Sequence, residues 1–361
     1  MRVWVVGLGT VGRWLLSAFE AQSERLAARY GLRPVVLGAA NARDGFVYDA
    51  DGLEVPTLLR LVSSGRPLTD LPDVRHWPTA LDGLRSTEAD VLVEVSSSPS
   101  VDGEPGFTHM REALRRRIPV VTSNKWPVAL HGVELAGLAR SGSVSFRAES
   151  TVMSGTPVLS TLVDGLAGTT PVALRGILNA TANFILGRMA AGMSYEAALT
   201  EAQETGLAER DPTADVEGHD AMAKAMILAA LVFGRQLLPG QVERRGITGV
   251  QQEEIEEATA AGARIGLVAT LELSDPEGEG DLSARVEPEL LHGDDPLASI
   301  EGSTNAVVCT AEPVGEVTVI GPGAGPALAG QGVLSDLIAV ARTHRRNERG
   351  PHPEVPRDAA A

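Results

Sequence analysis

The chain has 361 residues, enough for about two domains, and its 43% apolar and 22% charged residues are typical of a globular enzyme. The formal net charge of −16 argues against a general nucleic-acid-binding surface. A single cysteine, Cys309, excludes an internal disulfide and fits a reducing compartment. The N-terminus has no signal-peptide layout and no apolar run reaches about 18 residues, so we expect a cytoplasmic protein without a membrane span.

Residues 1–150 alternate between strand-like and helix-like segments. The strand candidates are Val3–Val6, Pro34–Ala40, Asp90–Val95 and Ile118–Thr122. The helix candidates are Val11–Tyr30, Met110–Arg117 and Val133–Arg140. Such alternation indicates a parallel sheet with helices on both faces. The sequence therefore predicts an α/β fold whose first domain is a Rossmann-type doubly wound parallel sheet.

The pattern changes after Glu149 to longer helical stretches with scattered strands. The helix candidates are Pro157–Leu166, Asn183–Ala191, Tyr195–Thr205 and Val216–Phe233, and the strand candidates are Val172–Leu178, Leu282–Glu287, Ala306–Cys309 and Val314–Ile320. Grouped helices with mixed strands predict an α+β second domain over residues 151–320. We expect a turn and helix over 321–344 that return to the first domain. Residues 345–361 contain three prolines and few apolar residues, which predicts a disordered tail.

A glycine loop follows the first predicted strand and opens the first predicted helix. It reads Gly7-Leu8-Gly9-Thr10-Val11-Gly12. Gly7 permits a tight turn, Gly9 lets the backbone approach a pyrophosphate, and Gly12 lets the helix pack closely on the strand. The free N–H groups at the start of the helix, near Thr10 and Val11, then face the phosphates. This order of elements predicts a nicotinamide dinucleotide site.

The end of the second predicted strand bears on the choice between NAD and NADP. An acidic residue there would favour NAD by binding the ribose hydroxyls. The strand instead ends in Asn41-Ala42-Arg43, and Arg43 could meet the 2′-phosphate of NADP. Asn41 could still bind a plain ribose, and Asp44 is near. We therefore expect NADP or NAD, with NADP favoured.

The densest group of charged residues lies between Gly206 and Lys224. Asp220 and Lys224 are four residues apart, so they lie on one face of a helix that begins near Asp215. Glu209 and Asp215 precede that helix, so three carboxylates and one ammonium can converge at its start. Carboxylates suit a substrate ammonium group, and a lysine can pass a proton to an oxygen. The alternative is a solvated acidic loop with one ion pair.

The amino-acid sequence of this segment resembles that of homoserine dehydrogenases. Gly206 to Lys224 is similar to the substrate loop of that family, and Asn124-Lys125 looks like its Asn-Lys after the last parallel strand. Further matches occur in the same order along residues 1–343. They are Glu149-Ser150-Thr151-Val152, Gly176-Ile177-Leu178-Asn179-Ala180-Thr181-Ala182-Asn183 and Gly321-Pro322-Gly323-Ala324-Gly325. The resemblance implies an NAD(P)-dependent oxidoreductase that interconverts L-homoserine and L-aspartate 4-semialdehyde.

Site roles follow from the resemblance position by position. It implies catalytic roles for Lys125, Lys224 and Asp220, with Lys125 passing the proton at the reacting oxygen. It implies that Glu209, Asp215 and Thr181 bind the substrate. It also implies cofactor contacts at Ser96, Gly206 and Gly325, in addition to the glycine loop and Arg43.

Three further expectations come from the same resemblance. A monovalent cation, Na⁺ or K⁺, would be held by backbone carbonyls near Glu149, Val152, Ser154 and Thr156, although Met153-Ser154 replaces family glycines in that turn. Residues 151–320 would also form a homodimer. No regulatory domain is expected, because no room for one remains after residue 345.

Two other functions remain open at this point. The departures near the pocket, such as Ala180 in place of a common glycine, are compatible with a related dehydrogenase of another small amino or hydroxy acid. A cofactor-binding sensor without turnover is a second alternative, which the presence of both Lys125 and Lys224 disfavours. Cys309 offers no nucleophile, because no base is visibly paired with it.

Overall fold

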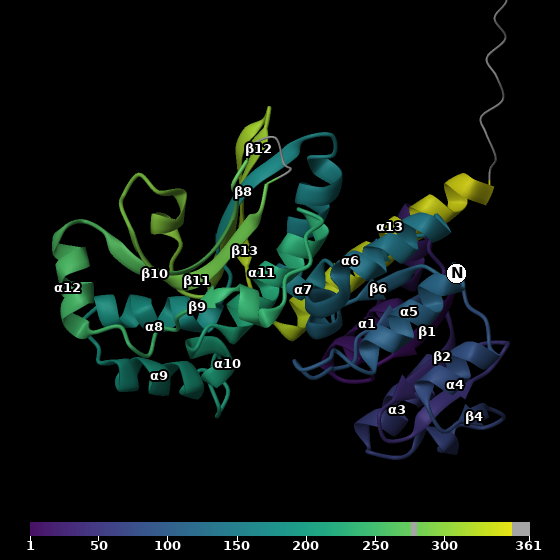
Figure 1. Cartoon of the computed structure of the whole chain (residues 1–361). Helices are drawn as coiled ribbons and strands as arrows, with labels where there is room; N and C mark the ends of the chain where they lie inside the picture. Colours follow the sequence, from purple (N-terminus) through teal and green to yellow (C-terminus); the bar gives the residue numbers. More distant parts are fainter. Residues whose placement is uncertain (276–279, 349–361) are drawn as a thin grey trace, which may run out of the picture.

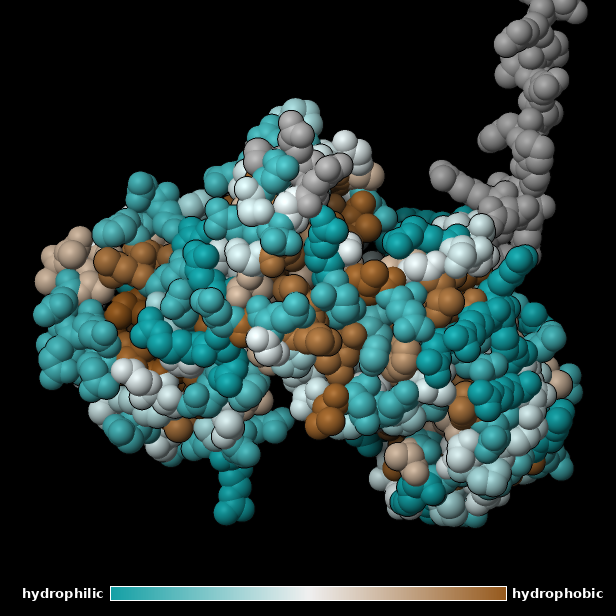
Figure 2. Space-filling view, in the orientation of Figure 1, coloured by the Kyte–Doolittle hydropathy of each residue, from teal (hydrophilic) through white to brown (hydrophobic). Residues whose placement is uncertain are grey.

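The computed structural model describes residues 1–275 and 280–348, with side chains of the last helix described up to residue 343. The chain folds into two lobes, each built around its own β-sheet (Figure 1). Figure 2 shows hydrophilic residues over most of one face, with apolar residues reaching the surface near the junction of the lobes. Within the described ranges, no helix is long and apolar enough to cross a membrane.

The N-terminal lobe contains a seven-stranded sheet, sheet A, in the order β4-β3-β2-β1-β5-β6-β7. Its strands are β1 (Arg2–Val6), β2 (Val35–Asn41), β3 (Gly45–Tyr48), β4 (Arg75–Trp77), β5 (Val91–Glu94), β6 (Val120–Thr122) and β7 (Phe146–Arg147). The run β2-β1-β5-β6-β7 is parallel, which confirms the predicted sheet. Strands β3 and β4 extend one edge in antiparallel pairing, which the sequence pattern did not indicate.

Helices cover both faces of sheet A, as a doubly wound fold requires. Val3 and Val5 of β1 pack in an apolar cluster with α1, α3 and the last helix, α13, whereas Trp4 and Val6 pack with α4, α5 and α6. The helical segments of this lobe are α1 (Thr10–Ala21), α2 (Ser23–Arg25), η1 (Leu26–Tyr30), α3 (Val55–Ser63), η2 (Leu68–Asp70), α4 (Ala80–Ser86), α5 (Gly106–Arg115) and α6 (Lys125–Gly142).

The second lobe contains a six-stranded sheet, sheet B, in the order β13-β12-β8-β10-β11-β9. Its strands are β8 (Thr170–Ile177), β9 (Glu243–Arg244), β10 (Arg264–Leu273), β11 (Leu282–Leu291), β12 (Thr304–Glu312) and β13 (Gly315–Pro322). All neighbours pair antiparallel except β9 with β11. Strand β10 lies in the centre of the sheet and was not predicted.

The helices of the second lobe pack their apolar sides into one large core. They are η3 (Ser160–Gly165), α8 (Ala180–Ala190), α9 (Tyr195–Glu204), α10 (Thr213–Val216), α11 (His219–Leu231), η4 (Pro239–Gln241), α12 (Gln252–Ala260) and η5 (Pro296–Ser299). The single helix predicted over Val216–Phe233 is wrong at its start. Gly218 adopts φ +77°, a left-handed conformation that ends α10 and starts α11.

The two lobes are joined by α7 (Ser150–Met153) and by the final helix, α13 (Pro326–Glu348). Helix α13 returns from sheet B to pack on α1, where a Cβ on Gly330 would lie 2.2 Å from the ring of Trp14. The helix runs four residues into the segment predicted as a tail, and residues 349–361 of that segment lie outside the described residues.

Candidate active site

A cleft of about 890 Å³ opens at the carboxyl ends of β1, β2 and β5. The order of sheet A reverses between β1 and β5, and doubly wound folds bind ligands at such a point. Gly7, Gly9, Thr10, Val11 and Ser96 line the cleft. Five of the residues predicted to contact the cofactor therefore share one surface.

The glycines of the loop fit a dinucleotide. Gly7 has φ +105°, and a Cβ there would lie 2.4 Å from the backbone nitrogen of Ser96. A Cβ on Gly12 would lie 2.0 Å from the carbonyl oxygen of Gly7. A Cβ on Gly9 would meet no atom within 4 Å, so the backbone there faces open space. Gly7 and Gly12 thus allow close packing, while Gly9 leaves room for a pyrophosphate at the start of α1.

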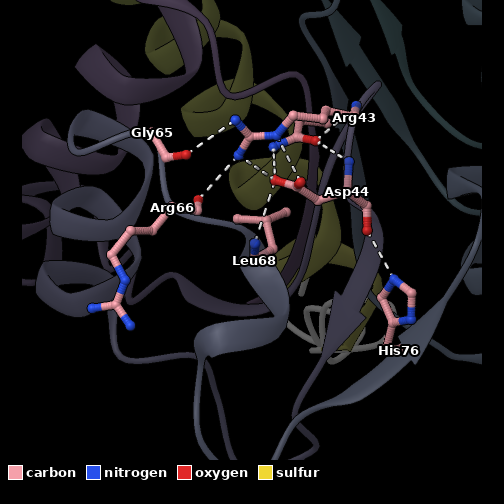
Figure 3. A network of polar contacts seen from close by, with 7 residues as sticks. Arg43, Asp44, Gly65, Arg66, Leu68 and His76 are labelled. Carbon is pink, nitrogen blue, oxygen red and sulfur yellow. Dashed lines mark hydrogen bonds and ion pairs between the residues drawn. The ribbon is translucent and has the colours of Figure 1, made fainter.

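Arg43 does not line the cleft, although Asn41 does. Its guanidinium makes two bonds to Asp44, at 2.7 and 2.9 Å, and donates to the carbonyls of Gly65 and Arg66 (Figure 3). Arg43 and a 2.8 Å bond from Asn41 Nδ2 lower the carboxyl pKa of Asp44 to about 2. The cation expected to meet a 2′-phosphate is therefore neutralised by its neighbour.

A second pocket, of about 440 Å³, is lined by both lobes. Helix α6 contributes its first residues, and the second lobe contributes α7, α8, α10, α11 and the loop before α13. The pocket contains all the residues predicted for catalysis and substrate binding: Lys125, Lys224, Asp220, Glu209, Asp215 and Thr181. The fold thus brings together residues that lie as much as 99 positions apart in sequence.

Asp220 lies between the two lysines of this pocket. One carboxylate oxygen accepts a hydrogen bond from Lys125 of the N-terminal lobe. The other oxygen is 2.8 Å from Nζ of Lys224, one turn further along α11. Lys224 also donates to the carbonyl oxygen of Leu178 at 2.6 Å. A single carboxylate therefore connects the two lobes and orders both ammonium groups.

In the triad of Lys125, Asp220 and Lys224, burial and charge shift the pKa values of Asp220 and Lys224 in definite directions. Burial would raise the pKa of Asp220, but the charges of Lys125 and Lys224 outweigh it and hold that pKa well below its ordinary value. Burial lowers the pKa of Lys224, and Asp220 opposes this effect only in part. Lys224 therefore holds its proton less tightly than a solvent-exposed lysine does.

The other end of the pocket is acidic. Asn179 donates from Nδ2 to Asp215 at 2.7 Å and to Asp220 at 3.0 Å. Burial raises the pKa of Asp215, so this carboxylate gains from a cationic ligand. Thr181 donates to the carbonyl of Leu207 at 3.2 Å. Sequence reasoning assigned no role to Asn179, because its two acceptors come from a distant segment.

Gly206 and Gly325 are absent from the described residues that line the two pockets. Gly206 has φ +73° just after α9, and Gly325 has φ +138° just before α13. Both make turns that few other residues tolerate. Gly323 and Ala324 line the second pocket, and Gly325 is the next residue along the chain.

The turn predicted to hold a cation packs against the loop before α13. Ser154 has φ +51° and donates from its hydroxyl to the carbonyl of Gly323 at 3.2 Å. The carbonyl of Thr156 already accepts a bond from Val158 at 2.9 Å. Within the described residues no group of three or more His, Cys, Asp or Glu side chains could hold a metal ion. Of the carbonyls predicted to hold the cation, that of Glu149 also accepts a bond, from Val152 at 3.5 Å, so two of them are already engaged.

The basic residues of the sequence carry a further signal for this site. The chain has 31 basic residues, and only Lys125 and Lys224 are lysines. Both line the second pocket. A chain that uses arginine everywhere else and keeps two lysines in one pocket points to chemistry that an arginine, which stays charged, cannot perform.

Comparisons with known proteins agree along almost the whole chain. Residues 7–149 match the model of the homoserine dehydrogenase NAD-binding domain, and residues 157–338 match that of homoserine dehydrogenase. The NAD(+)-dependent homoserine dehydrogenase of Pseudomonas canavaninivorans is 38% identical over 344 residues, covering 95% of this chain and 97% of that protein. A putative homoserine dehydrogenase from Archaeoglobus fulgidus superposes with a TM-score of 0.82 at 32% identity, covering 94% and 99% of the two chains. A hyperthermophilic archaeal homoserine dehydrogenase in complex with NADPH gives 0.77 at 30% identity, covering 95% and 98%.

Proposed function

The chain belongs to the homoserine dehydrogenase family, and from this premise we propose that Lys125, Asp220 and Lys224 carry out its proton transfer. As a member of that family it is an NAD(P)-dependent oxidoreductase that interconverts L-homoserine and L-aspartate 4-semialdehyde. The family match favours this activity over the dehydrogenase of another acid and over the sensor without turnover. The observation that carries the proposed roles is the ion pairing of Asp220 with both lysines.

The two lysines act on the reacting oxygen of the substrate. A nicotinamide dinucleotide in the cleft lined by Gly7, Gly9 and Ser96 would supply the hydride acceptor for oxidation and the hydride donor for reduction. On oxidation, the amine of Lys125 removes the hydroxyl proton of homoserine; on reduction, its ammonium returns a proton to the aldehyde oxygen. Lys224 donates to the same oxygen and stabilises the charge that develops there. Asp220 holds both side chains in place, which lowers the entropic cost of reaching the transition state.

The amino-acid end of the substrate lies at the acidic end of the pocket. Glu209 and Asp215 bind the ammonium group, because the half-buried carboxylate of Asp215 is stabilised by a cation. Thr181 and Asn179 hold the loop and Asp215 in position for this contact. The arrangement supports a small substrate with an ammonium group at one end and a hydroxyl at the other.

The preference between the two cofactors depends on Arg43 and Asp44. The sequence favoured NADP because Arg43 follows the second strand. The structure supports the opposite preference, since Asp44 neutralises Arg43 and two carbonyls hold it away from the cleft. A 2′-phosphate would therefore meet no free guanidinium at this position. We propose that this enzyme uses NAD in preference to NADP.

We further propose that the protein is a homodimer that forms through the second lobe. Strand β13 is an edge strand of sheet B, and Ile320 on it is 55% exposed. An exposed edge with an apolar side chain can pair with a second copy of the same strand. Light scattering tests this proposal, because Ile320→Lys should reduce the measured mass towards that of a monomer.

A monovalent cation remains a prediction for the turn at Val152–Thr156. The buried carbonyls of the turn are the ligand type that Na⁺ and K⁺ use, but the carbonyl of Thr156 is shared with Val158. We assign the cation no step in the reaction. A rise in melting temperature with KCl or NaCl, compared with equal choline chloride, would support binding.

Initial rates with the purified enzyme test the proposed function. L-homoserine should reduce NAD, whereas 4-hydroxybutyrate, which lacks the ammonium group, should react at least about tenfold more slowly, since a lost charged contact is worth about 1.5–3 kcal/mol, or about 10- to 150-fold. Comparable rates for 4-hydroxybutyrate and homoserine would contradict the ammonium site at Glu209 and Asp215.

A further inference from the structure

A buried carboxylate lies beneath the cofactor cleft and has no role in the chemistry described above. Glu94 ends β5 and is 0% exposed. Its carboxylate accepts a hydrogen bond from the hydroxyl of Ser96 and another from Nδ2 of Asn124 at 2.9 Å. Among the described residues, the basic side chain within ion-pair distance is His109, whose Nδ1 is 3.8 Å from a carboxylate oxygen. Burying such a charge is costly, so its partners indicate what it does.

His109 connects this carboxylate to the cleft. It lies in the first turn of α5, is 5% exposed, and lines the cleft beside Thr108. Its Nδ1 atom is buried and has no hydrogen-bond partner within the usual distance. Buried polar atoms in folded proteins are normally paired. The carboxylate of Glu94 is the acceptor that Nδ1 faces, so a small movement of the imidazole ring would complete a hydrogen bond between them.

Asn124 connects the carboxylate of Glu94 to the catalytic Lys125. Asn124 caps α6 immediately before Lys125, and its Nδ2 atom also donates to the hydroxyl of Ser98 at 2.8 Å. The packing around it is tight, because a Cβ on Gly106 would lie 2.5 Å from that Nδ2 atom. The floor of the cofactor cleft and the start of α6 are therefore joined by hydrogen bonds around Glu94.

We propose that His109 is a cofactor-binding residue for the nicotinamide-side ribose and that Glu94 is its positioning residue. With its proton on Nδ1 and directed at Glu94, a neutral imidazole presents Nε2 to the cleft as an acceptor. Ser96 gives its own proton to Glu94 and accepts one bond from Asn124 Nδ2 at 3.4 Å, so its oxygen keeps one lone pair for a ligand. Two acceptors on one wall match the two neighbouring hydroxyls of a ribose.

The position of His109 along the cleft favours the ribose over the phosphates. Gly9 and the start of α1 leave open space for the pyrophosphate. His109 lies on α5, on the side of the cleft where Asn124 leads to Lys125, and the reactive end of the cofactor must approach that lysine. The inference rests on the binding of the dinucleotide in this cleft, which belongs to the proposed function.

Calorimetric titration with ADP-ribose and with ADP tests the proposal without turnover. The two ligands share the pyrophosphate, but ADP-ribose alone carries the second ribose. His109→Phe should weaken ADP-ribose binding about tenfold, the equivalent of one hydrogen bond, and change ADP binding less than twofold. His131→Phe is the matched control, because His131 stacks on Phe107 at 3.8 Å but does not line the cleft. Both affinities should be unchanged in that control.

Three results would overturn the inference. If His109→Phe weakens the binding of ADP and ADP-ribose equally, His109 contacts the pyrophosphate and not the ribose. If it weakens neither, His109 does not contact the cofactor. A wild-type enzyme that binds neither ligand would contradict the placement of the dinucleotide itself, which separates that failure from a failure of the His109 assignment.

Glu94→Gln tests the positioning role by a different readout. Nuclear magnetic resonance of the ¹⁵N-labelled imidazoles should find the Nδ1–H tautomer of His109 in the wild type and a shift towards Nε2–H in Glu94→Gln. ADP-ribose affinity should fall severalfold in the same variant, with ADP affinity unchanged. An unchanged tautomer would refute the role of Glu94, and this measurement remains informative if His109→Phe does not fold.

Discussion

Lys125 and Asp220 are 95 residues apart in sequence and belong to different lobes, yet they form an ion pair in the substrate pocket. Lys125 comes from the first turn of α6, and Asp220 from the first turn of α11. The contact closes the substrate pocket across the two lobes. The Lys125 ammonium belongs to the start of α6, and α6 begins at the floor of the cofactor cleft. The first two predictions follow from this geometry.

Lys125→Met should lower kcat by at least about a hundredfold, because general acid–base catalysis contributes on the order of 10²–10⁴. Binding of ADP-ribose should stay within twofold of the wild type, because Lys125 does not line the cofactor cleft. Steady-state kinetics and calorimetry measure the two effects. Arg25→Met, on the exposed surface of α2, is the control and should leave both unchanged. A kcat near that of the wild type would refute proton transfer by Lys125.

Lys224 should titrate below the ordinary pKa of a lysine, because it is buried. Selective ¹⁵N labelling of lysine side chains makes this measurable, since the chain has two lysines and each gives one signal. In Asp220→Asn the pKa of Lys224 should fall further, because the carboxylate that raises it is removed. A pKa of Lys224 that rises in this variant would contradict the arrangement of the triad.

Asp44→Asn should shift the enzyme towards NADP. Removing the carboxylate frees Arg43 to pair with a 2′-phosphate, and a charged hydrogen bond of about 1.5–3 kcal/mol corresponds to a rise in kcat/KM for NADP of at least about tenfold. The rate with NAD should change little. Initial rates with each cofactor measure the ratio.

Two variants control the Asp44 experiment. Asp70→Asn removes a carboxylate paired with the neighbouring Arg66 at 2.8 Å and should leave the cofactor ratio unchanged. Adding Arg43→Ala to Asp44→Asn should cancel the gain with NADP. A gain that persists without Arg43 would show that the guanidinium is not the group that Asp44 masks.

The sequence predicted contacts between residues that are close in sequence and contacts that family motifs imply. Asp220 and Lys224 are one helical turn apart, so their pairing follows from spacing alone. The pairing of Lys125 with Asp220 was not derivable in this way, because it depends on how the two lobes pack. The resemblance assigned both residues to one site, but it did not indicate that one carboxylate would join them.

Arg43 illustrates why a local pattern can mislead. It follows β2 closely, as the sequence predicted for a 2′-phosphate ligand, and the strand ends at Asn41, one residue beyond the predicted end. The side chain turns away because the next residue offers a carboxylate and because the loop at Gly65 offers a carbonyl. The second partner is 22 residues away, and its approach depends on the fold of the loop between α3 and η2.

Asp336 should make stability depend on pH between about 4 and 7. It lies on α13, is 5% exposed, and accepts the backbone N–H of Glu149 at 2.9 Å. Burial, with the charge of Glu149 adding to it, raises its pKa from 3.8 to about 7. The folded state therefore binds the proton more tightly than the unfolded state. The resulting stabilisation is fully present below about pH 4 and is lost as the pH rises through 7.

Urea unfolding at pH 5 and pH 8, at one protein concentration, measures this contribution. The free energy of unfolding contributed by Asp336 should fall by about 2 to 3 kcal/mol between these values, at about 1.4 kcal/mol per pKa unit. Asp336→Asn should remove that part of the difference, because an amide has no charge to bury yet still accepts the Glu149 N–H. Asp51→Asn, at an exposed position, should keep the wild-type dependence. If Asp336→Asn also keeps the wild-type pH dependence of unfolding, another group causes that dependence, and the carboxyl of Asp336 is ionised at both pH values.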